Sequence, residues 1–78
     1  MQVQVEFFSF AGDRMGTRSL TLEVEPGTTV GDLFRRWQDR LALPLERWMF
    51  AVNDEWAPAA TVLAAGDRVV FIPPVSGG

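Results

Sequence analysis

Two adjacent glycines end the chain behind a pair of prolines, and this arrangement makes the terminal carboxylate the candidate reactive group. Glycine lacks a Cβ atom, so Gly77 and Gly78 can enter a channel that is too narrow for any other residue. Pro73 and Pro74 fix φ and have no N–H to continue a sheet, so we expect residues 73–78 to leave the last strand as a projecting arm. A rigid proline segment that ends in two residues without side chains is suited to delivery into the active site of another protein. The alternative interpretation is a frayed terminus or a cloning scar.

Length and composition predict one small globular domain. The chain has 78 residues, of which 47% are hydrophobic and 22% are charged. These values are typical of an ordered, soluble protein, and there is no room for a second domain. We therefore expect residues 1–72 to form the domain and residues 73–78 to form an extended tail.

The side chains offer little chemistry of their own. The sequence has no cysteine and no histidine, which removes the thiolate nucleophile, the usual general base and the usual metal ligands. Ser76 therefore has no base to activate it as a nucleophile. Asp54 and Glu55 are adjacent in a predicted turn, so we interpret them as solvated surface groups rather than an acid–base pair. We expect no catalytic side chain, no metal and no bound cofactor.

Charge and hydropathy exclude two classes of partner. The net charge is −3, and the arginines are spread from Arg14 to Arg68 without a cluster, which argues against a nucleic-acid partner. The first residues lack the pattern of a signal peptide, and no apolar stretch is long enough to span a membrane. The expected location is the cytoplasm.

The first half of the sequence predicts a hairpin followed by a helix. Residues 3–10 and 20–24 read as strands, and the short turn-like segment between them favours antiparallel pairing. Thr29 and Asp32 have the spacing of a capping box. An apolar stripe then continues to Leu41, while opposite charges four residues apart, such as Asp32 and Arg36, predict ion pairs on the other face.

The second half predicts two further strands. These are residues 48–52 and 68–72, with a turn at residues 53–55. Residues 56–65 are ambiguous, and we expect a loop with a short strand or one helical turn. One helix over one face of a mixed sheet is an α+β fold, and pairing of the last strand with the first in the centre makes it a β-grasp.

Alternation along the strands predicts a docking surface beside the arm. Phe8 and Phe10 share a face opposite Phe7 if the first strand continues through them. One helix cannot cover aromatic side chains on both faces, so we expect an exposed apolar patch drawn from Phe8, Phe10 and Phe71 or Ile72. The alternative is that loops fold back over these residues.

The C-terminal block resembles that of the small, sulfur-carrying subunits of molybdopterin synthases, within the ubiquitin-like sulfur carriers. The resemblance includes Ala51-Val52-Asn53 and Leu63, and it is strongest in Gly66-Asp67-Arg68-Val69-Val70-Phe71-Ile72-Pro73-Pro74-Val75-Ser76-Gly77-Gly78. Related carriers of the thiamine pathway usually lack the proline pair. The segment from Phe10 to Arg18 departs from the family, because it looks like a plain hairpin loop where many members have a longer, partly helical insertion.

The resemblance implies a carrier without catalytic side chains. An ATP-dependent adenylating enzyme would activate the Gly78 carboxylate, and a sulfur donor would convert it to a thiocarboxylate. The large subunit of molybdopterin synthase would then receive the tail, in a heterotetramer of two small and two large subunits, and pass the sulfur to a cyclic pterin phosphate. Gly77 would give access to the active site, and Pro73, Pro74, Val75 and Ser76 would guide the arm.

Three other functions remain open at this point. The same tail chemistry would suit a carrier for thiamine thiazole, cysteine or a thiolated tRNA base. It would also suit a protein modifier that forms isopeptide bonds with lysines on its targets. The last alternative is an interaction module with an inert tail.

Overall fold

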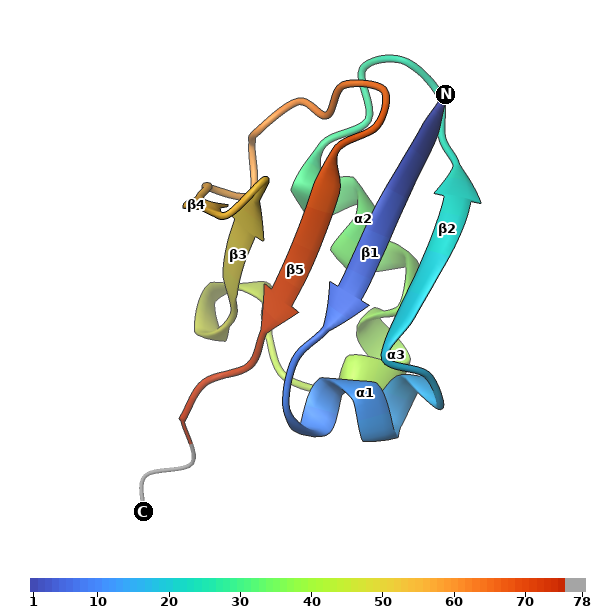
Figure 1. The fold of residues 1–78 in the computed structure, drawn as a ribbon. Helices are drawn as coiled ribbons and strands as arrows, with labels where there is room; N and C mark the ends of the chain where they lie inside the picture. Colours follow the sequence, from blue (N-terminus) through green and yellow to red (C-terminus); the bar gives the residue numbers. More distant parts are fainter. Residues whose placement is uncertain (76–78) are drawn as a thin grey trace.

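The computed structural model describes residues 1–75 and has an α+β architecture (Figure 1). Five strands form one sheet, with the helices on one of its faces and the C-terminal segment pointing away from the body. The elements, in chain order, are β1 (Gln2–Phe7), α1 (Phe10–Met15), β2 (Ser19–Glu23), α2 (Val30–Arg36), α3 (Gln38–Leu41), the 3₁₀ helix η1 (Leu45–Arg47), β3 (Met49–Val52), β4 (Glu55–Trp56) and β5 (Arg68–Ile72).

The order of the strands is β2-β1-β5-β3-β4, which is the predicted β-grasp arrangement. β1 pairs antiparallel with β2 and parallel with β5, and β5 pairs antiparallel with β3. The predicted antiparallel pairing of the first two strands and the central pairing of the last strand with the first are therefore confirmed. The two-residue strand β4 begins at Glu55, in the predicted turn, and ends at Trp56, the first residue of the ambiguous segment, which continues as a loop. Within residues 1–75, no helix combines the length and the apolar character needed to cross a bilayer.

The helix begins at the predicted capping box. The Asp32 backbone N–H donates to the Thr29 hydroxyl at 3.1 Å, and the Thr29 N–H donates to the Asp32 carboxylate at 2.9 Å. Two further predictions for this segment were wrong. The helix does not run unbroken to Leu41, because Trp37 leaves helical geometry at φ −118° and separates α2 from α3. Asp32 pairs with Arg35 at 3.4 Å, one residue earlier than predicted.

The segment between β1 and β2 is helical, so the prediction of a plain hairpin loop over residues 10–18 was wrong. β1 ends at Phe7, and the chain turns at Ser9, whose φ is 54°. α1 buries Ala11 and Met15 and ends at Gly16 in the left-handed conformation that glycine favours. Arg14 then donates a 2.7 Å hydrogen bond to the carbonyl at the end of α3. The signals for this helix were the spacing of its apolar residues and the glycine behind it.

Aromatic rings fill the space between the sheet and the helices. Phe71 of β5 lies 5.6 Å from Phe7, 5.4 Å from Phe50 and 6.1 Å from Phe34, measured between ring centroids. The rings meet edge-on or tilted, which is the favoured geometry for aromatic pairs. Phe34 and Phe71 are completely buried. The last strand is therefore anchored in the centre of the core.

The capping box makes the stability of the fold depend on pH. The Thr29 backbone N–H, and then the Thr29 hydroxyl contact and the charge of Arg35, hold the pKa of Asp32 below its ordinary value of 3.8. A lowered pKa stabilises the fold above the unfolded value, and this contribution is lost as the pH falls through the folded value. We expect Asp32→Asn to lower the melting temperature at pH 7 but to have a smaller effect at an acid pH below the folded pKa, where Asp32 is itself protonated. An equal loss at both pH values in thermal unfolding would contradict this.

Candidate functional site

Strand β5 fixes the point where the tail leaves the domain. Val69 and Phe71 are completely buried, and the Phe71 carbonyl accepts a 3.0 Å hydrogen bond from the Phe8 N–H. Pro73 is still buried, whereas Val75 is 92% exposed. Figure 1 shows this segment pointing away from the sheet. The root of the tail is thus held by the core at Pro73, and the chain has left the core at Val75.

Three predicted tail residues lie beyond this point. Ser76, Gly77 and Gly78 are outside the described residues, so their predicted roles remain predictions.

A hollow of about 230 Å³ lies at the root of the tail. Phe8, Ser9 and Phe10 line one side, and residues 72–75 line the other. Ser9 has φ 54° and ψ −138°, a combination that glycine adopts far more readily than serine. This turn takes the chain from β1 into α1 and thereby brings the three residues against the tail. Among residues 1–75, none of the side chains that line the hollow is a carboxylate or a cation, so these side chains can guide the tail but supply no acid or base.

The four predicted docking residues differ in their exposure to solvent. Phe8 is 60% exposed, and Ile72 is half-buried. Phe10 is half-buried in α1, where its ring lies 6.3 Å from that of Trp48. Phe71 is completely buried, so its inclusion in an exposed patch was wrong. Alternation in β5 explains the difference, because one residue of each neighbouring pair must face the helices.

The prediction that Phe8 and Phe10 share a strand face was also wrong. β1 ends at Phe7, and the two residues are separated by the turn at Ser9.

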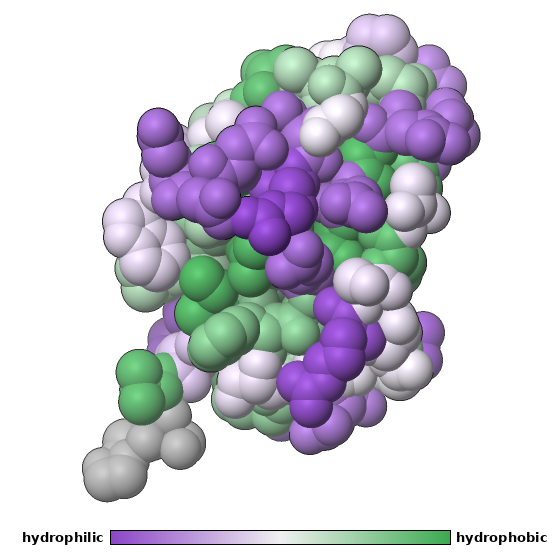
Figure 2. Space-filling model, viewed as in Figure 1, coloured by the Kyte–Doolittle hydropathy of each residue, from purple (hydrophilic) through white to green (hydrophobic). Residues whose placement is uncertain are grey.

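The open side of the sheet carries two exposed apolar side chains that the sequence analysis missed. Met49 is 52% exposed and pairs with Ile72, while Trp56 is 67% exposed and pairs with Ala51. Together with Phe8 and Ile72, Met49 and Trp56 form what we call the open-face patch. Figure 2 shows hydrophobic surface on this side between the polar upper part and the tail. The available signal was the alternation of Met49 with buried Phe50, which places methionine on the uncovered face.

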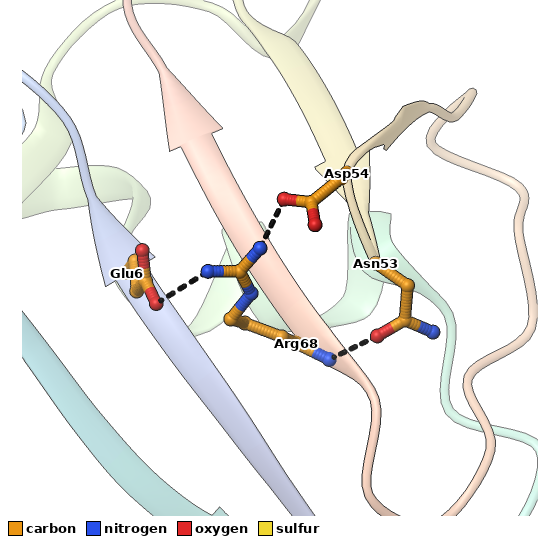
Figure 3. A network of polar contacts seen from close by, with 4 residues as sticks. All are labelled: Glu6, Asn53, Asp54 and Arg68. Carbon is orange, nitrogen blue, oxygen red and sulfur yellow. Dashed lines mark hydrogen bonds and ion pairs between the residues drawn. The ribbon is translucent and has the colours of Figure 1, made fainter.

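A polar network holds the first residue of β5 in place (Figure 3). The Arg68 guanidinium donates to Glu6 of β1 at 3.4 Å and also to Asp54. The Arg68 backbone N–H donates to the Asn53 side-chain oxygen at 3.0 Å, and the Asn53 amide donates to Asp67 at 2.9 Å. These contacts join β1, β5 and the β3–β4 turn at the end of the sheet opposite the tail.

The turn in this network has two residues in left-handed conformations. Asn53 has φ 51° and Asp54 has φ 71°, as a two-residue hairpin connection requires. Asp54 and Glu55 are both exposed, in agreement with their interpretation as surface groups. Within residues 1–75, no three carboxylates come close enough together to hold a metal ion.

The turn and its network predict different losses of stability for two variants of Asn53. Asn53→Gly keeps the left-handed backbone but loses two side-chain hydrogen bonds, which contribute about 0.5–1.5 kcal/mol each. Asn53→Ala loses the same bonds and adds about 1 kcal/mol or more for a left-handed alanine. We expect the alanine variant to be the less stable of the two in urea unfolding. Equal stabilities would show that the turn conformation contributes nothing.

Comparison with known proteins identifies the family. The model of the ThiS family matches residues 5–78. A "Molybdopterin synthase sulfur carrier subunit" from Mycobacterium tuberculosis is 47% identical over 60 residues, which cover 73% of this chain and 72% of that protein. The protein of the same name from Homo sapiens is 32% identical over 83 residues, covering 99% of this chain and 94% of that one.

A solved structure agrees with this assignment. The complex of subunits 1 and 2 of the molybdopterin-converting factor from Helicobacter pylori contains a chain with a TM-score of 0.66 and 26% identity, and the match covers 100% of both chains. The sequence match, the relatives and the shared fold together show that this chain belongs to the ThiS family, among relatives named as sulfur carrier subunits of molybdopterin synthase.

Proposed function

We propose that this protein carries sulfur for the synthesis of molybdopterin, as a thiocarboxylate on Gly78. The observation that carries the proposal is the tail at the end of β5, which is anchored at buried Phe71 and Pro73 and reaches the surface at Val75. The diglycine lies at the end of this tail, where it is suited to enter a narrow active site. The names of the relatives support the same function.

The carrier supplies a carboxylate, and its partners supply the catalysis. A carboxylate is a poor electrophile until one of its oxygens becomes a good leaving group. ATP-dependent adenylation of Gly78 would form an acyl-adenylate with release of pyrophosphate. A sulfur donor would then form the carbon–sulfur bond and displace AMP. The product is a stored sulfur nucleophile, and tethering it to a protein raises its concentration at the acceptor.

Two partners follow from this chemistry. One is the adenylating and sulfurating enzyme, and the other is the large subunit of molybdopterin synthase, in a heterotetramer of two small and two large chains. The Helicobacter pylori complex of subunits 1 and 2 supports the second partner. The sulfur acceptor on the large subunit would be a cyclic pterin phosphate, and two transfers would give a dithiolene. No bound cofactor is required on the carrier itself.

The open-face patch is the surface we assign to the large subunit. Phe8, Met49 and Trp56 are more than half exposed although they are large and apolar. Phe8 and Ile72 also line the hollow at the root of the tail, so a protein that covers the patch lies where the tail begins. Burial of such residues is a major source of binding energy in protein interfaces.

The intact mass of the protein tests the carrier function. After incubation with ATP, a sulfide source and the adenylating enzyme of the same cell, we expect an increase equal to the replacement of one oxygen by sulfur, localised to Gly78. A variant that lacks Gly78 is the control and should stay unchanged. No shift would support an inert tail, and adducts that contain a target peptide would support a protein modifier.

The docking surface is tested by two variants of matched exposure. Phe8→Asp places a charge in the open-face patch and is expected to weaken binding to the large subunit by about tenfold or more. Val62→Asp is the control, because Val62 is 61% exposed but pairs with Thr29 at the start of α2, away from the tail. Binding is measured by titration calorimetry, with circular dichroism to check folding. Equal affinities of the two folded variants would refute the docking surface.

A further inference from the structure

The cationic side chains of this protein are of one chemical kind. All seven cationic side chains are arginines, and the α-amine of Met1 is the single primary amine in the sequence. A guanidinium stays protonated at neutral pH and therefore does not attack an activated acyl group. An amine does so once it loses its proton. One group of this sequence thus has the chemistry to capture an activated tail as an amide.

That one amine is engaged in the fold. The Met1 ammonium donates to the Glu23 carboxylate at 3.1 Å and to the Val24 carbonyl at 3.0 Å. The adjacent Met1 carbonyl accepts from the Val24 N–H at 2.8 Å, and the Gln2 carbonyl accepts from the Gly66 N–H at 2.8 Å. These bonds hold the start of β1 against β2 and the loop before β5. To act as a nucleophile, the amine must lose a proton and leave two acceptors.

The amine also lies far from the tail of its own chain. β1 and β5 run parallel, with Gln4 beside Arg68 and Phe7 beside Phe71. Met1 is therefore at one end of the sheet and the tail at the other (Figure 1). Six residues of strand span about 20 Å. The five residues after buried Pro73 reach at most about 17 Å even when fully extended.

We infer that the surface of this protein determines the specificity of its activated tail. Because the surface offers no free amine to the activated acyl group of Gly78, this group reacts with the sulfur donor and not with the protein itself. The two parts of this device are the arginines at every cationic position and the clamp on Met1 by Glu23 and Val24. The inference rests on the proposed function, because it concerns the fate of the activated Gly78.

The reaction that is avoided is ordinary acyl transfer. An amine would attack the activated carbonyl of Gly78, a carbon–nitrogen bond would form, the bond to the leaving group would break, and the amine proton would pass to solvent. Within one chain the product is a ring, and between chains it is a covalent dimer. Either product would remove the carrier irreversibly, because an amide is not reopened by sulfur.

The test places lysine at two positions that differ in their distance from the tail. Arg18 lines a hollow together with Phe8 and Ser9, which also line the hollow at the root of the tail. Arg36 lies at the opposite end, in a hollow with Met1 and Glu23. Both arginines are exposed, and Arg18→Lys and Arg36→Lys each keep the charge. Each chain is prepared with a thioester of a small thiol at Gly78, by a route that needs no adenylating enzyme.

The expected products differ among the three chains. An intramolecular amine acts at an effective concentration on the order of 1 mM, about a hundredfold above that of a partner chain at about 10 µM. Arg18→Lys should therefore form a ring, seen as loss of the thiol from the intact mass, at a rate independent of protein concentration. Arg36→Lys should form only dimers, at a rate that increases with protein concentration. The wild-type thioester should mainly hydrolyse.

A third variant tests the clamp on the amine. Glu23→Ala removes the carboxylate from Met1 and is expected to increase acylation at the N-terminus several-fold, as measured by peptide mapping of the dimers. Unchanged acylation would show that the Glu23 carboxylate does not limit the reactivity of the Met1 amine.

Two results would overturn the inference as a whole. One is self-acylation of the wild-type chain as fast as that of Arg18→Lys. The other is an Arg18→Lys chain that folds normally and reacts with added ethylamine but not with its own lysine. Because the thioester is made without ATP or a partner enzyme, these results are independent of whether Gly78 acquires sulfur in the cell.

Discussion

The burial of β5 between β1 and β3 is the constraint on which the rest of the structure depends. Its pairing with β1 is parallel, so the chain must pass from one end of the sheet to the other between the two strands. Strands β2 and β3 make that passage, and the helices that connect them cover one face of the sheet. Phe71 is fixed in their contact with the sheet by rings from β1, β3 and α2. The tail starts two residues later, at a position set by the core.

The same constraint leaves the other face of the sheet uncovered. Because alternate residues of a strand face opposite sides, burial of Phe50 and Phe71 directs Met49 and Ile72 to the open face. The carrier therefore presents apolar side chains beside the tail as a consequence of its core. Exposed apolar surface of this kind is a feature of interaction sites in small soluble proteins. The polar network around Arg68 lies at the other end of the same face and keeps the strand in register.

The sequence was sufficient for the features that depend on local pattern. The capping box at Thr29, the last strand and its central pairing with the first were predicted correctly, because each has a strong periodic or capping signal. α1 was missed because Gly12-Asp13 inside it and Gly16-Thr17 behind it suggested a turn. The break at Trp37 was missed because the apolar stripe continues through it, and tertiary contact of the Trp37 ring with Phe7 is not visible in a pattern.

The candidate site, too, was predictable from sequence only in part. The tail was recognisable from its residue types alone, whereas membership of the exposed patch depended on which face each strand residue takes. Phe71 was assigned wrongly, and Met49 and Trp56 were missed, because the facing of neighbouring strands is settled by register. The positive φ at Ser9, which brings Phe8 against the tail, has no signal in the residue type. Strand facing and the turn at Ser9 are both set by tertiary structure and not by local sequence.

The division between a fixed root and a glycine tip also determines how the tail can be used. Ordering a free residue costs about 1–2 kcal/mol in backbone entropy, and glycine costs more than other residues. A tail of two glycines therefore binds weakly by itself, while buried Pro73 limits the number of residues that must be ordered. Under the proposed function, the open-face patch would supply the affinity and so raise the effective concentration of the tip at the partner's active site. A carrier that visits an activating enzyme and then an acceptor needs this arrangement, since a tail that bound tightly to the first would not reach the second.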